Sequence, residues 1–395
     1  MSEIEYRLAT PEEWLSFARL QNFVFSFVRD EKEIKEKIAG GGYKNEDVYV
    51  AIGEDGQVLA GMGVIPFTIW FDGQKVPMAG IGGVAGTPEN RRKGNIRNIF
   101  AKVFRDINEK GVVFSHLYPF SYAYYQKFGY EHCGTAKRYT LRTACARKFK
   151  NNGTTCEFVN GDDVQSKLTD VYEAYASRQN AMISRSELRW KEVFDFPSFG
   201  DTRFYYWQNE KQEVKAWVKF KRDGHKLMIH DIAWSDSEGM FGILQFLGRF
   251  DGAAETFTFT SSPELIPEIY WDSIYEIETE TAGLGMNRIV NVKRALELMK
   301  KPEGNGKFVI KVIDDFLEWN NATYTVEYSN GECSVETTEC FAADIETNER
   351  ALTQMVLGVY GFDNLALRED VSVYGNQDVL GKVFCKKNVF ITDGF

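Results

Sequence analysis

One stretch of the sequence, residues 81–98 (IGGVAGTPENRRKGNIRN), combines residue types suited to binding a phosphate group. A glycine-rich run leads into a turn at Pro88, and basic residues then precede a helix-like pattern. The first backbone N–H groups of a helix lack partners inside it and carry the positive end of its dipole, so they bind anions. Gly94 would let the backbone approach the anion. The cationic donors would be Arg91, Arg92, Lys93 and Arg97. The stretch therefore predicts a pyrophosphate cradle.

Three other interpretations of this stretch compete. A Walker loop is excluded because the chain has no GxxxxGK[ST] sequence. A dinucleotide fingerprint would follow the first strand, whereas this cluster follows the fourth predicted element. A solvated basic face remains the simplest alternative, since charge runs are often only solvated. The strands before the cluster, the amphipathic helix after it and the buried strand that follows together favour the cradle.

The elements around the cradle follow from hydrophobic periodicity and turn residues. Thr10, Pro11 and Glu13 have the pattern of a capping box, so a helix should begin there. A three-strand meander follows, with hairpin turns at the Asp-Gly pairs 55–56 and 72–73. The next predicted elements are a helix over 94–111, a buried strand over 112–119, a short helix over 121–128 and a strand over 129–143. Ile96, Ile99, Phe100, Val103, Phe104 and Ile107 share one face of the longer helix.

Composition excludes several function classes. The net charge of −10 argues against nucleic acid as a partner, because phosphate binding needs a basic face. The first residues lack the basic and apolar regions of a signal peptide, and no run of 18 apolar residues predicts a membrane span. The six cysteines form no CxxC pair and the four histidines lack zinc-ligand spacing. We therefore expect a reduced, cytoplasmic protein that binds neither a metal nor a membrane.

The order of elements repeats along the chain, which suggests a duplicated domain. After a polar segment near residues 146–155, a second unit again places strands before a helix and a further strand. A third unit of alternating strands and helices begins near Met286. Three domains are expected, over residues 1–148, 149–285 and 286–395.

The cradle resembles the acetyl-CoA loop of the GNAT N-acetyltransferases, which reads R/Q-x-x-G-x-G/A. Arg91 and Gly94 match it, and Ile96 departs from its last small residue. The segments TPENRRKGNIR, YPFSYAYYQKFGYE and SRSELRWKEVF, with an aromatic C-terminus, resemble Eis (enhanced intracellular survival) acetyltransferases along essentially the whole chain. This resemblance implies an α/β fold class with mixed sheets: an active GNAT domain, a degenerate GNAT domain, then a sterol-carrier-protein-like α+β domain. It also implies hexamers that transfer acetyl groups from acetyl-CoA to amines of small molecules, including aminoglycosides, or of peptides.

The resemblance assigns a set of acetyl-CoA-binding residues. The glycine-rich strand would pair with pantetheine, and a backbone N–H near Val84 would face the oxyanion. Phe120 and Ser121 would touch the thioethylamine end. The predicted set is Gly83, Val84, Ala85, Gly86, Arg91, Arg92, Lys93, Gly94, Asn95, Ile96, Arg97, Phe120 and Ser121.

The resemblance also implies an acid and a base. Tyr125 would protonate the departing thiolate, since a phenol has a pKa near 10. The alternative is an aromatic packed beside Phe128 and Tyr130; neighbouring Tyr124 would point about 100° away on a helix. The base would be the terminal carboxylate of Phe395. A free α-carboxyl has a pKa of about 3.5, so it needs desolvation to act as a base, or it orients the amine.

Other chemistry-bearing residues are expected to be structural. His116 and His230 lie on predicted buried strands and are expected to be core residues. In the second unit, Asp236 and Glu238 occupy the position of the cradle and would repel a phosphate. Two alternatives stay open: lipid binding in a tunnel lined by residues 355–362 of the third unit, and acyl transfer from aminoacyl-tRNA, which the acidic charge disfavours.

Overall fold

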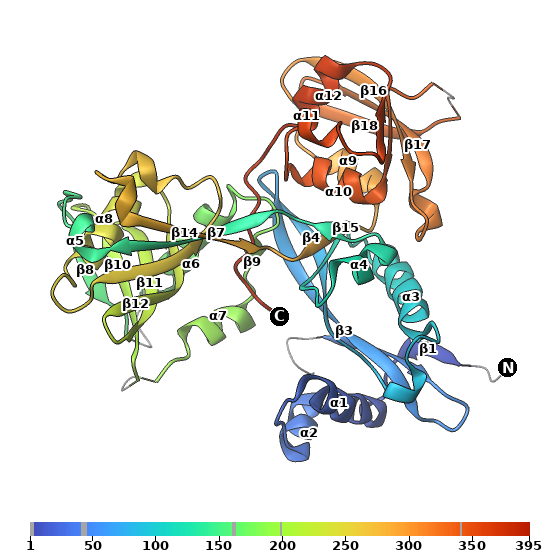
Figure 1. The fold of residues 1–395 in the computed structure, drawn as a ribbon, viewed down its shortest axis with the longest axis horizontal. Helices are drawn as coiled ribbons and strands as arrows, with labels where there is room; N and C mark the ends of the chain where they lie inside the picture. The colour runs from blue at the N-terminus through green and yellow to red at the C-terminus, as the bar shows by residue number, and fades with distance from the viewer. Residues whose placement is uncertain (1–3, 41–45, 160–162, 198–199, 340–341) are drawn as a thin grey trace.

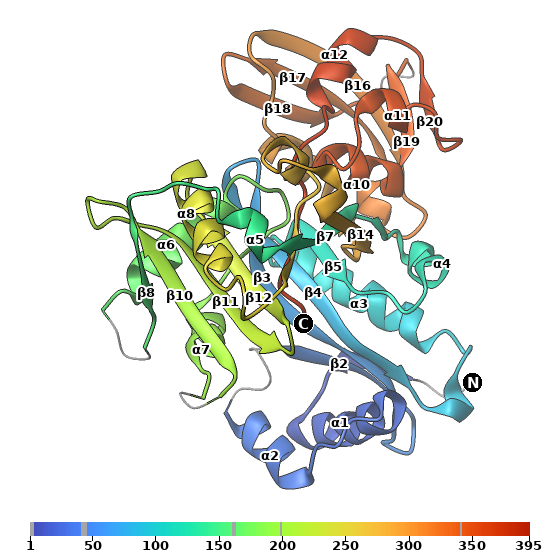
Figure 2. The ribbon, with the colours of Figure 1, turned by 60° about the vertical axis from the view of Figure 1, so that its left-hand side comes forward.

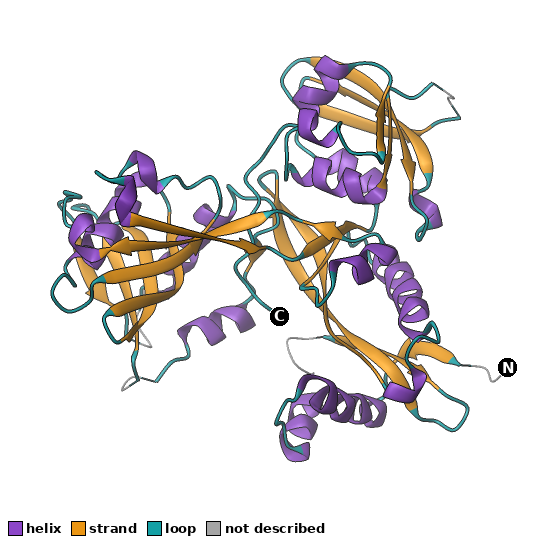
Figure 3. Ribbon diagram, in the orientation of Figure 1, coloured by secondary structure: helices purple, strands orange, loops and turns teal. Residues whose placement is uncertain are grey.

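The computed structural model describes residues 4–40, 46–159, 163–197, 200–339 and 342–395. Three mixed β-sheets with helices packed on them form three lobes around the centre of the molecule (Figures 1 and 3). The predicted fold class, an α/β chain with several mixed sheets, is confirmed.

The first sheet has the strand order β1-β2-β3-β4-β5-β15-β6, and β9 pairs with β3. Its strands are β1 Glu5–Leu8, β2 Asp47–Ile52, β3 Val58–Phe71, β4 Gln74–Gly86, β5 Phe114–Leu117, β6 Glu131–His132, β9 Ile183–Ser184 and β15 Met286–Ile289. Its helices are α1 Pro11–Phe25, α2 Glu31–Ala39, α3 Asn95–Glu109 and α4 Tyr122–Tyr125, and its 3₁₀ turns are η1 Pro88–Asn90 and η2 Gln126–Phe128. Helices α1 and α3 pack on opposite faces.

Local sequence signals account for both long helices of this unit. The Thr10 hydroxyl accepts from the backbone N–H of Glu13, whose carboxylate accepts from the N–H of Thr10, so the predicted capping box is present. Helix α3 begins after Gly94, which has a left-handed φ of 86°. Its predicted apolar face is buried, apart from a half-buried Ile96. Strand β1, before the first helix, was not predicted, because four residues carry little periodic signal.

The second sheet has the order β14-β7-β13-β12-β11-β10-β8. Its strands are β7 Thr135–Arg142, β8 Thr154–Glu157, β10 Thr202–Gln208, β11 Val214–Asp223, β12 Lys226–Trp234, β13 Thr256–Ser261 and β14 Ile277–Gly283. Its helices and turns are α5 Thr143–Ala146, α6 Gln165–Ala176, α7 Glu187–Phe194, α8 Ser237–Gly248, η3 Pro267–Ile269 and η4 Ile274–Glu276. As in the first sheet, a meander runs through a helix into a parallel neighbouring strand: β4·β5 pair in parallel there, and β12·β13 here.

One antiparallel ladder joins the two sheets. Strands β6 and β7 run in one direction and β14 and β15 in the other, with partners from Ile277↔Leu141 to Asn287↔Glu131 in a single register. At the crossing, the N–H of Leu284 donates to the carbonyl of Gly134 (3.2 Å). Strand β15 thus completes the first sheet beside β5, while β7 completes the second beside β13. Each sheet therefore contains a strand from the other side of the crossing. Figures 1 and 2 show the paired strands β7 and β14 near the centre of the molecule.

The third unit has a sheet of order β18-β17-β16-β19-β20 with helices on one side. Its elements are α9 Val292–Leu298, β16 Asn305–Ile313, η5 Glu318–Asn320, β17 Ala322–Ser329, β18 Glu332–Thr337, β19 Ile345–Asn348, α10 Glu349–Leu357, α11 Phe362–Leu365, β20 Val371–Val373 and α12 Gln377–Val383. Met355, Val356, Leu357 and Phe362, which were considered as the lining of a lipid tunnel, are buried in the hydrophobic core. This packing disfavours the lipid-binding alternative.

After α12 the chain leaves the third unit and crosses to the centre of the molecule (Figure 1). Lys387 forms an ion pair with Asp72 in the β3–β4 turn (2.6 Å). Val389 then forms a parallel bridge with Asn180, so the tail is fixed to both other units. The C-terminus therefore lies between the first two sheets.

The third unit also touches the first through a buried ion pair. Arg288 and Asp314 are fully buried and lie 2.7 Å apart. Arg288 also donates to the backbone carbonyl of Phe128, at the end of η2. Nearby Glu349 is buried, and its burial, reinforced by the charge of Asp314, raises its pKa to about 7. This interface therefore contains a carboxyl group that ionises near neutral pH.

Glu349→Gln is expected to raise the melting temperature more at pH 8 than at pH 5. The folded state holds the Glu349 proton more tightly than the unfolded chain does. The contribution of this proton to the free energy of unfolding is therefore fully present below about pH 4.5 and is lost as the pH rises through 7. At 1.36 kcal/mol per pKa unit the loss is on the order of 3 kcal/mol at most. Thermal unfolding at both pH values checks this, with Glu369→Gln, an exposed carboxylate, as the control. An equal shift at both pH values would contradict it.

None of the helices in the described part of the chain has the length and apolar content needed to cross a bilayer. Within the same residues, no group of three or more His, Cys, Asp or Glu side chains is arranged to hold a metal ion.

Candidate active site

Strands β4 and β5 part in the middle of the first sheet. Their parallel pairing runs from Met78↔Phe114 to Ile81↔Leu117 and ends there. Strand β4 continues for five more residues to Gly86, whereas β5 ends and the chain turns towards α4. Residues 82–86 of β4 therefore lie beside a position that no described strand occupies. An extended ligand could pair with the backbone there.

A β-bulge marks this part of β4. Gly82 pairs with Gly63, but Ala85 pairs with Gly61, so Gly83 and Val84 together oppose one residue of β3. Gly83 has a φ of 59°, and a Cβ there would overlap with the side-chain amide of Gln21. That amide donates to the Gly83 carbonyl (3.1 Å). The bulge re-aims the backbone at the point where the strands separate, as bulges near active sites do.

The predicted cradle forms the turn between β4 and α3. Arg91, Arg92, Lys93, Gly94 and Arg97 are exposed. Arg92 has a left-handed φ of 62° and Gly94 one of 86°, an unusual conformation for an arginine. Arg91 and Arg92 form no ion pair within the described residues, so both charges are available to an anion. Lys93 instead donates to Asn90 (3.0 Å).

Two cradle residues connect to other parts of the chain. The Arg97 guanidinium lies 4.8 Å from the ring centre of Phe316, in the third unit. Asn95 is buried; its Oδ1 accepts from Tyr6 (3.2 Å), while its Nδ2 has no partner within the described residues. The half-buried Ile96 packs against the core. The third unit thus supports the first turn of α3.

Tyr125 lies at the end of α4, in the segment that follows β5. It is buried with 4% of its surface exposed, among the rings of Phe100, Phe120 and Tyr124. Burial, and to a lesser extent Tyr124, raises the pKa of its hydroxyl above the ordinary value for tyrosine. No hydrogen bond to that hydroxyl occurs within the described residues. A phenol held protonated in this way is able to donate a proton.

The two remaining predicted contacts lie just before α4. Phe120 is exposed and its ring centre lies 5.5 Å from that of Tyr125. Ser121 is half-buried and precedes the helix without capping it. Both residues thus lie in the segment that follows β5, next to Tyr125.

The C-terminal residue lies on the first sheet, not in the third unit. The ring of Phe395 contacts Phe67 of β3 (4.9 Å between centres), His116 of β5 (5.7 Å) and Tyr118 (5.5 Å). A Cβ on Gly80 would lie 2.7 Å from this ring, so Gly80 leaves the space that it fills. Within the described residues no hydrogen bond or ring contact joins Phe395 to Tyr125.

The two histidines that were expected to be core residues differ in burial. His116 is fully buried, its Nδ1 lies 3.1 Å from Oδ1 of Asn287, and burial lowers its pKa to about 4. It is therefore neutral at physiological pH and packed in the core, as expected. His230 lies on β12 and lines a cavity of about 320 Å³ between the first two sheets, together with Tyr118 and Gly394. His230 is exposed, so the expectation that it is a core residue is wrong.

In the second sheet, the N-terminus of α8 is the counterpart of the predicted cradle, and a side chain of the protein caps it. Asp236 is the N-cap of α8 and accepts from the backbone N–H of Gly239 (2.9 Å). Lys215 forms an ion pair with the same carboxylate (3.2 Å). The side chain of the protein therefore occupies the position that a phosphate would need, as the sequence predicted.

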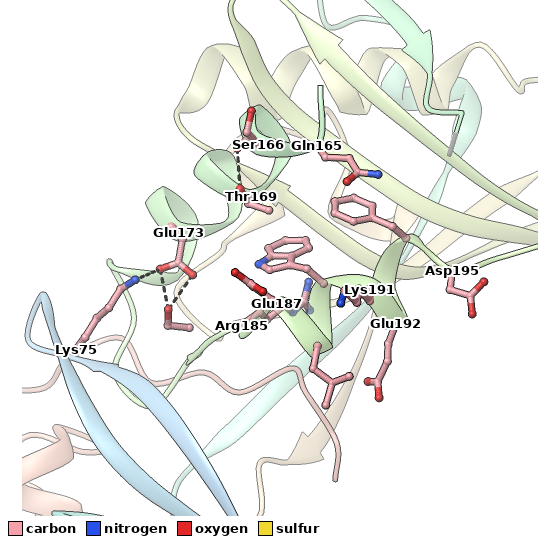
Figure 4. A pocket seen from close by; sticks show the side chains of 14 residues that line it. Lys75, Gln165, Ser166, Thr169, Glu173, Arg185, Glu187, Lys191, Glu192 and Asp195 are labelled. Carbon is pink, nitrogen blue, oxygen red and sulfur yellow. Dashed lines mark hydrogen bonds and ion pairs between the residues drawn. The ribbon is translucent and has the colours of Figure 1, made fainter. Parts of the chain in front are cut away.

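Figure 4 shows another cavity, of about 850 Å³, between α6 and α7. Its inward carboxylate, Glu173, is already bound by Lys75 (3.0 Å) and by Ser184 (3.0 Å). None of the predicted site residues lines it. A large open cavity alone thus does not identify the reactive centre of this protein.

Sequence reasoning missed a polar cluster that holds the C-terminal tail. Asp393 is buried and contacts Arg185, Arg189 and Tyr172. The segment SRSELRW contains both arginines and had been noted, but only as a mark of resemblance. Nothing local links it to a residue 208 positions later.

Comparison with known proteins agrees with this geometry. Residues 5–133 match the family model of the acetyltransferase (GNAT) domain, and residues 292–391 match that of the sterol carrier protein domain. The chain is 22% identical to N-acetyltransferase Eis of Mycobacterium tuberculosis over 304 residues, 74% of this chain and 73% of that protein. Eis of Mycobacterium bovis BCG aligns equally well.

Solved structures share the whole fold. A probable N-acyltransferase from Enterococcus faecalis superposes with a TM-score of 0.85 at 20% identity, over 100% of both chains. Eis1 from Mycobacterium abscessus gives a TM-score of 0.81 at 17% identity, again over 100% of both chains. A GNAT domain takes its acyl group from a coenzyme A thioester, which fits the parted strands and the cradle. The chain therefore contains a GNAT N-acetyltransferase domain and a sterol carrier protein domain, and it is similar to the Eis N-acetyltransferases.

Proposed function

We propose that the protein transfers the acetyl group of acetyl-CoA to an amine of a cationic small molecule, such as an aminoglycoside, or to a lysine or peptide amine. The observation that carries the proposal is the gap between β4 and β5. A bulged glycine strand borders this gap, the segment after β5 carries a buried tyrosine, and the turn after β4 carries two arginines that form no ion pair within the described residues. Pantetheine would lie along residues 83–86, and the pyrophosphate would lie against Arg91 and Arg92.

The chemistry would be a direct transfer in a ternary complex. The amine nitrogen forms a bond to the acetyl carbon, and a backbone N–H near Val84 stabilises the oxyanion. When the carbon–sulfur bond breaks, Tyr125 gives its proton to the thiolate. The carboxylate of Phe395 accepts or orients the amine proton, since its ring is held on the same sheet by Phe67 and Gly80.

We also propose the division of the chain into a catalytic GNAT domain (1–148), a degenerate GNAT-like domain (149–285) and a sterol-carrier-like domain (286–395). The capped start of α8 supports the term degenerate. Strand β7 lies in the second sheet and β15 in the first. The residue bounds of the three domains therefore do not coincide with the boundaries between the sheets. Hexamer formation and a cytoplasmic location rest on the resemblance to Eis proteins alone; light scattering of the purified protein tests the first.

A coupled assay of free thiol released from acetyl-CoA tests the activity. Aminoglycosides, linear polyamines and peptides with a free N-terminus or lysine should be compared as acceptors, and mass spectrometry should show the addition of one acetyl group. Turnover with at least one amine supports the proposal. Absence of thiol release with every amine class would contradict it.

Arg91→Glu is expected to raise the KM for acetyl-CoA at least tenfold with little change in kcat. The substitution places a negative charge where we expect the pyrophosphate, and charge-assisted bonds to phosphate are among the stronger polar contacts. Arg105→Glu is the matched control, because Arg105 is exposed on α3 but far from the N-terminus of that helix. Equal KM values for the two variants would contradict the placement of the pyrophosphate.

A further inference from the structure

We infer that Asp393 is a positioning residue: by engaging Arg185 and Arg189 it fixes the terminal carboxylate of Phe395 and keeps that carboxylate free of ion pairs. The inference rests on the proposed role of the terminus as the base. It assigns a part in the reaction to two arginines of the second unit, although they lie outside the catalytic GNAT domain.

Asp393 is bound from several sides. Nε of Arg185 lies 3.1 Å from one carboxylate oxygen, and Nη2 of Arg189 lies 3.2 Å from the same oxygen. The hydroxyl of Tyr172 donates to the other oxygen (3.2 Å). The Asp393 and Arg185 side chains are 4% and 3% exposed, so water hardly competes for the bond between them. The carboxylate therefore has one well-defined position.

The backbone on both sides of this carboxylate is held as well. Tyr118 donates to the carbonyl of Asp393 (3.0 Å), and Arg189 donates to that of Gly394 (3.1 Å). The Phe395 ring fills the space above Gly80. Only Gly394 separates the bound aspartate from the bound ring, so the terminal carboxylate has little freedom.

Tail stability alone does not require this cluster. The tail is already attached by the ion pair of Lys387 with Asp72 and by the bridge of Val389 with Asn180. Arg185 already has an anionic partner in Asp231, at 2.7 Å. A second buried carboxylate beside it is costly to desolvate, and buried ion pairs are often no more stable than apolar packing. The cluster therefore calls for a reason besides attachment.

The reason we infer is competition for the guanidinium groups. Arg189 already reaches the carbonyl of Gly394, one residue from the terminal carboxylate. If Asp393 carried no charge, Arg189 could pair with that carboxylate and lower its basicity. Burial alone would raise the pKa of Asp393, but Arg185 outweighs it and holds that pKa below the ordinary value. Asp393 therefore stays charged at neutral pH and engages Nε of Arg185 and Nη2 of Arg189, while Asp231 and Glu192 bind their Nη1 atoms.

The test is a double-mutant cycle on the full-length enzyme. Asp393→Asn and a chain with one glycine appended after Phe395 are made singly and combined. We expect Asp393→Asn to lower kcat at least tenfold, leave the KM for acetyl-CoA within twofold, and move the acid limb of the kcat/KM profile to lower pH. The combined variant should be no slower than the appended-glycine chain, because both changes act through the same carboxylate.

Asp72→Asn is the matched control, since it loosens the same tail upstream without touching the cluster. It should lower the melting temperature but leave the acid limb in place. If Asp393→Asn keeps the wild-type kcat while the chain with the appended glycine is slowed, the inference is overturned and the proposed function is left intact. The inference would also be overturned if the losses in kcat of the two single variants multiplied in the combined variant while the acid limb stayed in place. Asp393 would then have a merely structural role. If the appended glycine changes nothing, the terminal carboxylate has no role, and this inference and that step of the mechanism both fail.

Discussion

Tyr125→Phe is expected to lower kcat about a hundredfold, because general acid catalysis is typically worth 10²–10⁴ in rate. The hydroxyl is the only group removed, and it makes no hydrogen bond within the described residues, so the fold and the KM for acetyl-CoA should hardly change. Burial raises the pKa of Tyr125, so the wild-type enzyme should keep its acid protonated throughout the neutral and mildly alkaline range.

Tyr124→Phe provides the control for this experiment. Its ring centre lies 5.2 Å from that of Tyr125 and nearly perpendicular to it, and it is likewise packed against Phe128. The two variants remove the same atom from adjacent rings of one helix. If Tyr125→Phe turns over acetyl-CoA like the wild type, or if both variants lose activity equally, Tyr125 is a packed aromatic and not the acid.

Gly129→Ala is expected to cost about 4 kcal/mol or more of folding stability, and activity with it. Gly129 has a φ of 78°, and a Cβ there would overlap with Nη1 of Arg288. Arg288 cannot withdraw freely, because it is fully buried and paired with Asp314. Breaking a buried pair costs about 3–5 kcal/mol, and the left-handed backbone adds about 1–2 kcal/mol for a residue with a side chain. The turn after Tyr125 would be displaced as well.

Gly111→Ala separates the two contributions. Gly111 has nearly the same φ, 76°, but a Cβ there would meet nothing within 4 Å. This variant should lose only the backbone contribution of about 1–2 kcal/mol. Denaturant unfolding of both variants, followed by near-UV circular dichroism, measures the difference. Equal losses would mean that Arg288 yields easily and that the ion pair at this interface is not rigid.

Local signals in the sequence were sufficient for much of the fold. The capping box at Thr10, the turn glycines and the apolar face of α3 each specify structure within a few residues. The turn proposed as the cradle could be located for the same reason: a glycine-rich strand, a basic turn and a helix start are neighbours in the chain. The resemblance to a known family then supplied Tyr125 and Phe395, which no local pattern would have distinguished from core aromatics.

Contacts between distant segments could not be predicted in the same way. Nothing in the four residues of β15 indicates that they pair with β5 and not with the third sheet, since strand patterning fixes a face but no partner. The bond between Arg185 and Asp393 spans 208 residues. The support of α3 by Phe316 likewise joins the first unit to the third. Such contacts depend on how whole sheets pack, which local propensity does not encode.

The ladder that joins the first two sheets also determines when the first sheet can be completed during synthesis. Cys133 and Leu284, which meet at the crossing, are 151 residues apart. At translation rates of 5–20 residues per second the nascent chain waits roughly 10–30 s between them. During this interval β5 is an open edge, and open edges invite pairing with other chains. The first sheet therefore cannot be completed while residues 5–133 leave the ribosome. Its yield in a cell should depend on chaperones that shield the edge until residue 289 is made.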